Sequence, residues 1–147
     1  MFREIRESDR EIYYDFVDKF YHTDAVNAPV PTSNYELTFN EMMRSDAYVK
    51  GYIFEDDGVP CGFALLSKTF SQEAGGLSVT IEEIYLEPDF RGKGMGTAFF
   101  EFLKREIPAM RFRIEVEDDN EGAKRLYERM GFGLLPYLQM VIDKQRQ

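Results

Sequence analysis

The sequence contains one cysteine, one histidine and no tryptophan. With Cys61 alone, an internal disulfide is excluded, and a small buried side chain is a better interpretation of it than a nucleophile. The N-terminal residues MFREIRESDRE lack the apolar core of a signal peptide, and no segment is apolar over the length needed to cross a bilayer. We therefore expect a cytoplasmic protein that does not insert into membranes. The lone His22 is more consistent with a surface role than with catalysis, and we expect no metal ion.

Positive charge is also scarce, because 18 Lys and Arg face 27 Asp and Glu and the net charge is -9. Nucleic acids and anionic membranes bind proteins with an excess of cationic side chains, so the composition argues against both as partners. The deficit lies in residues 1–90, with a net charge of -11, whereas residues 91–147 carry +2. The two halves suit ligands of opposite charge, although ordinary solvated surface charge explains the split about equally well.

No linker rich in Pro, Gly or Ser interrupts the 147 residues, and no internal repeat is present. The hydrophobic fraction of 44% supplies one sizeable core, so we expect a single domain over residues 1–147. Hydrophobic periodicity and turn residues predict the order β-α-α-β-β-β-α-β-α-β, with one or two closing strands. The predicted strands are 2–5, 47–55, 59–69, 77–86, 112–117 and, within 132–142, the closing ones.

The predicted helices are marked by their ends. Capping boxes at residues 8–11 and 33–36 predict helices that run to about Tyr21 and Arg44. A third amphipathic pattern spans residues 94–107, and a fourth helix is capped by Asn120 and ended by Gly131. Together with a hairpin turn at residues 56–58, the order predicts a mixed α+β fold in which an antiparallel meander leads into a strand-helix-strand unit.

The segment Arg91-Gly92-Lys93-Gly94-Met95-Gly96 lies between a predicted strand and a predicted helix. Glycines let the backbone approach a ligand, and the first N–H groups of a helix have no partner within the helix and favour negative charge. The segment is not a Walker A loop, because no Gly-Lys-Ser/Thr closes it, and its glycine spacing does not fit a dinucleotide fold. The segment therefore predicts a phosphate site. The alternative is that its glycines serve only a tight turn.

At this point the sequence resembles the GNAT superfamily of acyl-CoA N-acyltransferases. The family loop Arg/Gln-x-x-Gly-x-Gly/Ala matches Arg91, Gly94 and Gly96, and its second element matches Asn120, Ala123, Leu126-Tyr127 and Gly131-Phe132. The resemblance implies a largely antiparallel central sheet with helices on both faces. It also implies acetyl-CoA as cosubstrate, held by the amides of residues 91–96, by Thr97 and by Asn120 and Ala123.

The resemblance further implies that the pantetheine arm runs along the exposed backbone of Ile84, Tyr85 and Leu86, where neighbouring strands splay apart. Tyr127 then takes the role of the general acid near the thioester sulfur, although it could instead be a core residue. A backbone N–H near Leu86 is the implied donor to the thioester carbonyl oxygen.

Two adjacent carboxylates, Glu82 and Glu83, precede this backbone, and the pair resembles one found in polyamine acetyltransferases. An alkylamine has a pKa near ~10.4, so a base must remove a proton before attack. Glu82 is the first candidate, with Glu83 and a water relay as alternatives, and both carboxylates are candidates for binding the amine. Strand alternation places Glu82 with Ile84 on one face and Glu83 on the other, unless a bulge upsets the parity. Their alternative role is protection of a strand edge.

These observations predict an acetyltransferase that acts by direct attack in a ternary complex. The acceptor is a primary amine on a small cationic metabolite of polyamine or aminoglycoside type. One alternative is acetylation of a protein N-terminus or lysine, and another is a non-catalytic acyl-CoA sensor. The sequence leaves the oligomeric state open, with a homodimer as one option.

Overall fold

The computed structural model describes residues 1–23 and 28–145, and the chain divides into two compact units, Met1–Glu115 and Val116–Gln147. The first unit contains the strands β1 (Phe2–Glu4), β2 (Val49–Asp56), β3 (Val59–Ser71), β4 (Gly76–Leu86) and β5 (Arg111–Ile114). Its helices are α1 (Arg10–Phe20), α2 (Thr32–Arg44) and α3 (Met95–Glu106), with short 3-10 turns at Glu7–Asp9 and Pro88–Phe90. The second unit contains α4 (Glu121–Arg129). A single domain over residues 1–147 stays a prediction.

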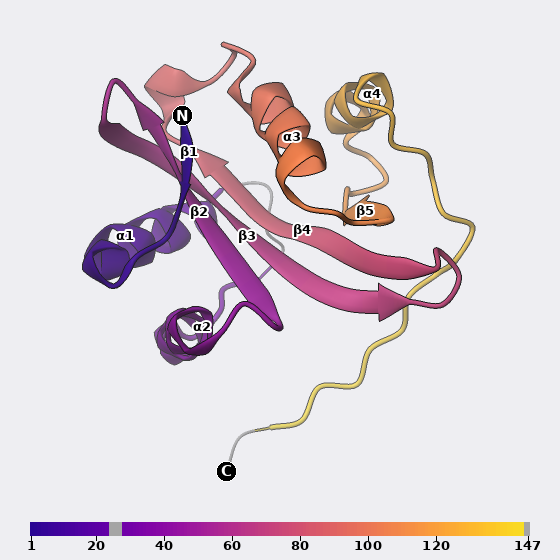
Figure 1. The fold of residues 1–147 in the computed structure, drawn as a ribbon, viewed down its shortest axis with the longest axis horizontal. Helices are drawn as coiled ribbons and strands as arrows, with labels where there is room; N and C mark the ends of the chain where they lie inside the picture. The colour runs from indigo at the N-terminus through magenta and orange to yellow at the C-terminus, as the bar shows by residue number, and fades with distance from the viewer. Residues whose placement is uncertain (24–27, 146–147) are drawn as a thin grey trace. The chain divides into compact units, whose positions relative to one another are not determined.

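The five strands form one sheet in the order β1-β2-β3-β4-β5, as Figure 1 shows. All neighbours are antiparallel except β4 and β5, which run parallel. A parallel pair needs a crossover connection, and α3 provides it. The predicted hairpin between β2 and β3 is present, with Asp57 at φ 50° and Gly58 at φ 78°, the left-handed conformations that a tight hairpin turn requires. The mixed, largely antiparallel α+β fold is confirmed.

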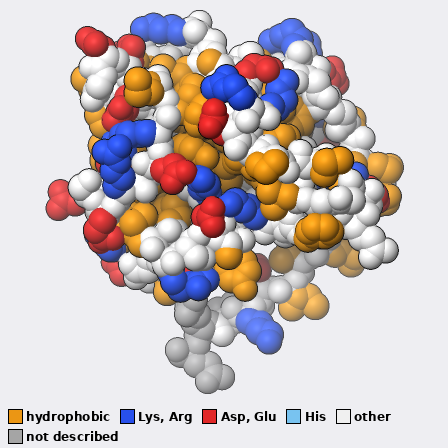
Figure 2. All heavy atoms as spheres, viewed as in Figure 1, with side chains coloured by type: hydrophobic (Ala, Val, Ile, Leu, Met, Phe, Trp, Pro, Cys, Tyr) orange, Lys and Arg blue, Asp and Glu red, His pale blue; other side chains and the backbone are white. Residues whose placement is uncertain are grey.

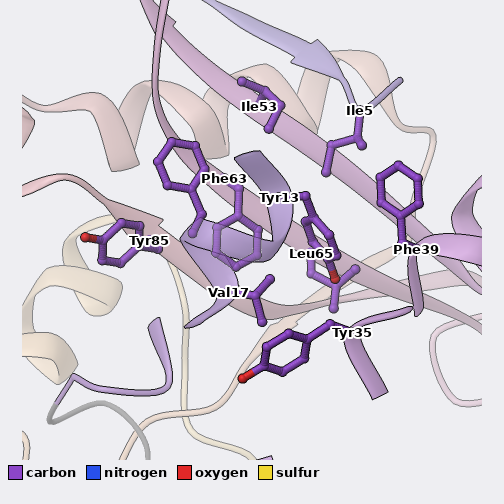
Figure 3. Close-up of a cluster of buried hydrophobic side chains, with 10 residues drawn as sticks. Ile5, Tyr13, Val17, Tyr35, Phe39, Ile53, Phe63, Leu65 and Tyr85 are labelled. Carbon is purple, nitrogen blue, oxygen red and sulfur yellow. The ribbon is translucent and has the colours of Figure 1, made fainter. Parts of the chain in front are cut away.

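Helices cover both faces of the sheet, as predicted. Side chains of α1 and α2 pack with Ile53, Phe63, Leu65 and Tyr85 in one buried cluster (Figure 3). On the other face Phe99 of α3 lies 4.6 Å, centroid to centroid, from the ring of Phe54. The sheet is therefore the middle of three layers within residues 1–115 (Figure 1).

The two predicted capping boxes are wrong. Ser8 lies inside the 3-10 turn that precedes α1, and α2 begins at Thr32, one residue before Ser33, with Pro31 as its N-cap. The start of α1 is fixed instead by Asp9, which accepts hydrogen bonds from the Arg6 N–H at 2.8 Å and from the guanidinium of Arg3 at 2.7 and 3.0 Å. An ion pair with β1 and the local hydrogen bond from the Arg6 N–H therefore replace the cap at Ser8 that the sequence pattern suggested.

The predicted closing strands within residues 132–142 are also wrong. Residues 132–142 have no regular secondary structure, and Leu138 and Met140 are 97% and 98% exposed. Their apolar alternation indicated strands, but a strand forms only where another strand accepts its backbone hydrogen bonds, and Pro136 in the middle has no N–H to donate. Similarly, β5 ends at Ile114 rather than at the predicted Glu117.

Candidate functional site

The predicted phosphate loop connects β4 to α3 in a conformation that depends on glycine. Gly92 and Gly94 have φ values of +74° and +78°, and Gly94 is the N-cap of α3. The first turn of α3 contains no acidic residue, and Lys104 and Arg105 lie in its last turn. The N–H groups of this first turn have no acceptor within the helix, so they and the helix dipole favour an anion here.

The space around this loop is open. A Cβ built on Gly92, Gly94 or Gly96 would meet no heavy atom within 4 Å. The glycines are therefore not needed to avoid a neighbouring part of the protein, and the backbone is accessible to a ligand. Two of them are needed for their positive φ, which other L-residues adopt only with strain.

The basic side chains of the loop fold back onto nearby rings. The Arg91 Nε donates to the Leu86 carbonyl oxygen at 2.8 Å, and its guanidinium lies 5.6 Å from the centre of the Tyr85 ring. The Lys93 amine lies 5.4 Å from the centre of the Phe90 ring. Both cations are held beside the loop, which adds to its positive potential.

One edge of β4 loses its partner where the predicted pantetheine site begins. The parallel pairing joins Ser78 to Arg111 and continues only to Ile81 and Ile114. Beyond that point β4 pairs with β3 alone, up to the pair of Leu86 with Gly62. The other edge of residues 84–86 therefore has no strand beside it within residues 1–115, as the resemblance implied.

The acidic pair lies at a β-bulge, which overturns the predicted parity. Leu65 pairs with Glu83 and Leu66 pairs with Ile81, so Glu82 is an extra residue in β4. The Ser67 hydroxyl donates to Glu82 Oε1 at 2.5 Å, and Ser67 shares the face of Leu65 because it is two residues along β3. The bulge thus turns both carboxylates to the α1 and α2 face, whereas simple alternation separates them.

The two carboxylates differ in their surroundings. Glu82 is exposed, whereas Glu83 is mostly buried, and the Tyr21 hydroxyl donates to its Oε2 at 2.5 Å. Glu83 Oε1 is buried and has no hydrogen-bond partner among the described residues. Burial raises the pKa of Glu83, the hydrogen bond from Tyr21 lowers it by less, and the charge of Glu82 raises it further.

A pocket of about 300 Å³ opens between α1 and α2. Its lining is acidic and aromatic, and consists of Tyr14, Asp15, Asp18, Thr32, Tyr35 and Glu36. The ring of Tyr35 stacks on that of Tyr21 at 5.9 Å. Tyr35 therefore lines the pocket and also contacts the residue that donates to Glu83. A cationic organic molecule suits such a lining. On the face of the molecule that Figure 2 shows, by contrast, acidic and basic side chains are interspersed.

The remaining predicted site residues lie on α4 in the second unit. The Asn120 side chain caps this helix by accepting from the Ala123 N–H at 3.1 Å, as predicted. Tyr127 is half-buried with its ring edge against Phe132, and burial raises the pKa of its phenol, which keeps it protonated at neutral pH. Gly131, at φ +102°, follows the helix. The predicted roles of Tyr127, Asn120 and Ala123 at coenzyme A stay predictions.

Sequence reasoning missed Tyr21, Tyr35 and the acidic pocket. No local signal identifies them, because Tyr21 and Glu83 are 62 residues apart in the chain and meet only in the folded sheet. The bulge that brings Glu82 to the same face was likewise hidden, since no Gly or Pro lies near Glu82 within β4.

The model of the acetyltransferase (GNAT) family matches residues 3–132. The chain belongs to this family. The match confirms the predicted resemblance to this family. An uncharacterized N-acetyltransferase of Methanocaldococcus jannaschii is 33% identical over 86 residues, which are 55% of this chain and 38% of that protein.

Solved structures of low sequence identity share the fold of this GNAT-family chain. An aminoglycoside N-acetyltransferase in complex with the bisubstrate analogue CoA-S-monomethyl-acetylneamine has a TM-score of 0.75 at 16% identity, over 99% of this chain and 97% of its own. A ribosomal-protein-alanine N-acetyltransferase from Brucella melitensis has a TM-score of 0.74 at 17% identity, over 98% and 99%. Among the described residues, no helix is long and apolar enough to cross a membrane.

Proposed function

We propose that this GNAT-family protein transfers the acetyl group of acetyl-CoA to a primary amine on a small cationic metabolite of polyamine or aminoglycoside type. Transfer takes place by direct attack in a ternary complex. The observation that carries the choice of acceptor is the mostly buried carboxylate of Glu83, which has no cationic partner among the described residues. An ammonium group supplies the missing charge.

The residues of the chain fit coenzyme A. The open backbone at Gly92, Gly94 and Gly96 admits a pyrophosphate to the amides of residues 91–96, with Thr97 and Lys93 beside it. The unpaired edge of Ile84, Tyr85 and Leu86 offers main-chain groups to the amides of the pantetheine arm. Asn120 and Ala123 complete the proposed set. When bound, acetyl-CoA supplies an activated thioester.

The acidic pair removes a proton from the acceptor ammonium, so that the neutral amine can attack. The sequence alone favours Glu82 as the base, but the different surroundings of the two carboxylates favour Glu83. A general base works best when its pKa lies near the operating pH, and burial moves Glu83 in that direction. Glu82, exposed at the bulge, then contributes charge for binding the amine.

The proton that the leaving thiolate needs comes from Tyr127, whose phenol stays protonated because burial raises its pKa. A backbone N–H near Leu86 donates to the thioester carbonyl oxygen. Starting from the ammonium, the acceptor loses two protons: Glu83 takes the first and later releases it to water, and the second, lost from nitrogen after attack, restores the Tyr127 phenol that protonated the thiolate. Charge and atoms then balance. The protein acts in the cytoplasm, without a metal, nucleic acid or membrane, as a monomer or a homodimer.

Two other functions are compatible with the same family. Acetylation of a protein N-terminus is favoured by the fold shared with a ribosomal-protein-alanine N-acetyltransferase. Binding of acyl-CoA without turnover requires only the donor half of the site. The pocket of about 300 Å³ beside α1 and α2 favours a small acceptor over a folded protein.

The test is release of free thiol from acetyl-CoA with a panel of polyamines, aminoglycosides, amino acids and peptides. We expect turnover with the multiply charged small amines and a loss of at least about 100-fold in kcat for Glu83→Gln. Glu36 is exposed but lines the pocket, so it does not serve as a control. Glu106 is exposed at the end of α3 and is not part of the pocket lining, so Glu106→Gln is the matched control for the loss of one carboxylate. Turnover with peptides alone would refute the proposed acceptor, and binding without turnover would favour a sensor.

A further inference from the structure

Tyr21 has the contacts of a residue that acts through Glu83. It lies at the C-terminal end of α1, where its N–H donates to the Val17 carbonyl oxygen at 3.0 Å. Its hydroxyl donates to Glu83 Oε2 at 2.5 Å, across 62 residues of chain. The Tyr21 side chain thus connects the end of α1 to the bulge of β4.

The Tyr21 ring is held from two sides. It stacks on Tyr35 of α2 at 5.9 Å with an interplanar angle of 15°, and it meets the Phe20 ring edge to face at 5.1 Å. Tyr35 also belongs to the buried cluster of Figure 3, with 7% of its surface exposed. A ring fixed in this way keeps its hydroxyl at one place, because rotation would disrupt both aromatic contacts.

Within residues 1–23 and 28–145, the ionisable groups that face Glu83 are all neutral or acidic. They are Tyr13 of α1, Tyr21 at its end, Tyr35 of α2 and Glu82 of β4. The phenols stay protonated, since burial raises the pKa of each of these tyrosines. Tyr21 is therefore a hydrogen-bond donor at every pH at which Glu83 titrates.

The two oxygens of Glu83 consequently have different tasks. Oε2 is engaged by Tyr21, whereas Oε1 has no partner among the described residues although it is buried. A carboxylate held by one oxygen cannot turn without losing that hydrogen bond, so its other oxygen is kept for an incoming donor.

We propose that Tyr21 is a positioning residue for the reaction: it holds Glu83 by Oε2 and stabilises its ionised form, so that Oε1 receives the proton of the acceptor amine. The inference rests on the proposed function, in which Glu83 is the base. Tyr21 itself exchanges no proton, and Tyr35 supports its ring.

The sign of the effect follows from the hydrogen bond. An O–H donated to a carboxylate favours the charged form, so the Tyr21 hydroxyl lowers the pKa of Glu83 while burial raises it. Tyr21→Phe keeps the ring and its stacking but removes the donor. The pKa of Glu83 is then expected to rise by about one unit, the usual scale for one hydrogen bond to a charged group.

The experiment compares the wild type with Tyr21→Phe and with Tyr35→Phe, which removes a hydroxyl from the other ring of the same stack. The pKa of Glu83 is measured by carbon NMR of its carboxyl group in protein labelled on glutamate, with assignment by Glu83→Gln. We expect a rise of about one unit in Tyr21→Phe and a change below about 0.2 unit in Tyr35→Phe. In parallel, kcat is measured against pH with a saturating amine, and unfolding temperatures check that each variant is folded.

The inference predicts that the acid limb of the kcat profile moves to higher pH by the same amount as the pKa of Glu83. Below this limb kcat falls at least about tenfold in Tyr21→Phe, and on the alkaline plateau it stays below the wild-type value, because Glu83 is no longer held by Oε2. An unchanged pKa of Glu83 would overturn the positioning role of Tyr21. A raised pKa with an unmoved kcat profile would instead overturn Glu83 as the base, and with it that part of the proposed function.

Discussion

The substitution Gly96→Asp is expected to make the protein more stable and to weaken its binding of coenzyme A. Gly96 lies in the first turn of α3, its φ is not in the left-handed region, and an added Cβ would meet nothing within 4 Å. A carboxylate at this place interacts favourably with the helix dipole, by about 0.3–1 kcal/mol. For a chain of this size the unfolding temperature should rise by about 1–3 °C.

Binding of coenzyme A should change in the opposite direction. The same carboxylate lies where the pyrophosphate is proposed to bind, and two negative charges about 5 Å apart repel by about 3 kcal/mol at an effective dielectric constant of 20. The Kd for coenzyme A should therefore increase about 100-fold at low salt, and the increase should shrink as salt screens the repulsion. In a neutral variant of the same shape, Gly96→Asn, the electrostatic part is absent.

The assay is isothermal titration calorimetry with coenzyme A at about 0.05 M and 0.3 M salt, together with calorimetric unfolding of all three proteins. Gly96→Asp must lose affinity relative to Gly96→Asn, with a difference that declines with salt. Equal affinities of these two variants would refute the assignment of the loop to the phosphates. A loss of stability in Gly96→Asp would show instead that the space around Gly96 does not admit a side chain.

Three further outcomes are expected. Tyr127→Phe should lower kcat about 100-fold or more and leave the calorimetric Kd for coenzyme A unchanged, whereas an unaltered kcat would exclude the general-acid role. Asp9→Asn should reduce the free energy of unfolding in urea by about 1–2 kcal/mol at pH 7. Because Arg3 lowers the pKa of Asp9 below its unfolded value, this difference should persist above about pH 4 and vanish as the pH falls through the folded pKa. Gly62→Ala should cost about 2–3 kcal/mol in the same urea assay, because its Cβ would lie 2.2 Å from the Tyr85 carbonyl oxygen.

The parts of the fold that depend on local chemistry could be predicted from the sequence. The turn at residues 56–58, the glycine loop before α3 and the Asn120 cap each require particular residues at particular places, and the structure contains all three. Glycine at positive φ and a side-chain oxygen before a helix have few alternatives. Two of them, the glycine loop and the Asn120 cap, belong to the proposed binding site for coenzyme A.

The failures arose where a distant part of the chain decides the local outcome. Asp9 pairs with Arg3 instead of completing a cap at Ser8, because β1 brings a guanidinium to the start of α1. The apolar alternation within residues 132–142 indicated strands, yet periodicity alone does not supply a partner. The stacked pair of Tyr21 and Tyr35 lies on two different helix ends, so no spacing in the sequence relates it to β4.

The bulge at Glu82 determines on which face of the sheet the two carboxylates of the proposed acceptor site lie. It removes one residue from the ladder between β3 and β4, which by itself weakens the sheet. In return it turns a second carboxylate to the face where Glu83 is already mostly buried, and the charge of Glu82 raises the pKa of Glu83. Such an arrangement destabilises the folded state of the unliganded protein. A cation that binds beside the two carboxylates stabilises the folded state. A sheet that merely needed charged residues to protect its edge would keep both carboxylates in water, and the burial of Glu83 therefore argues for a cationic ligand on this face.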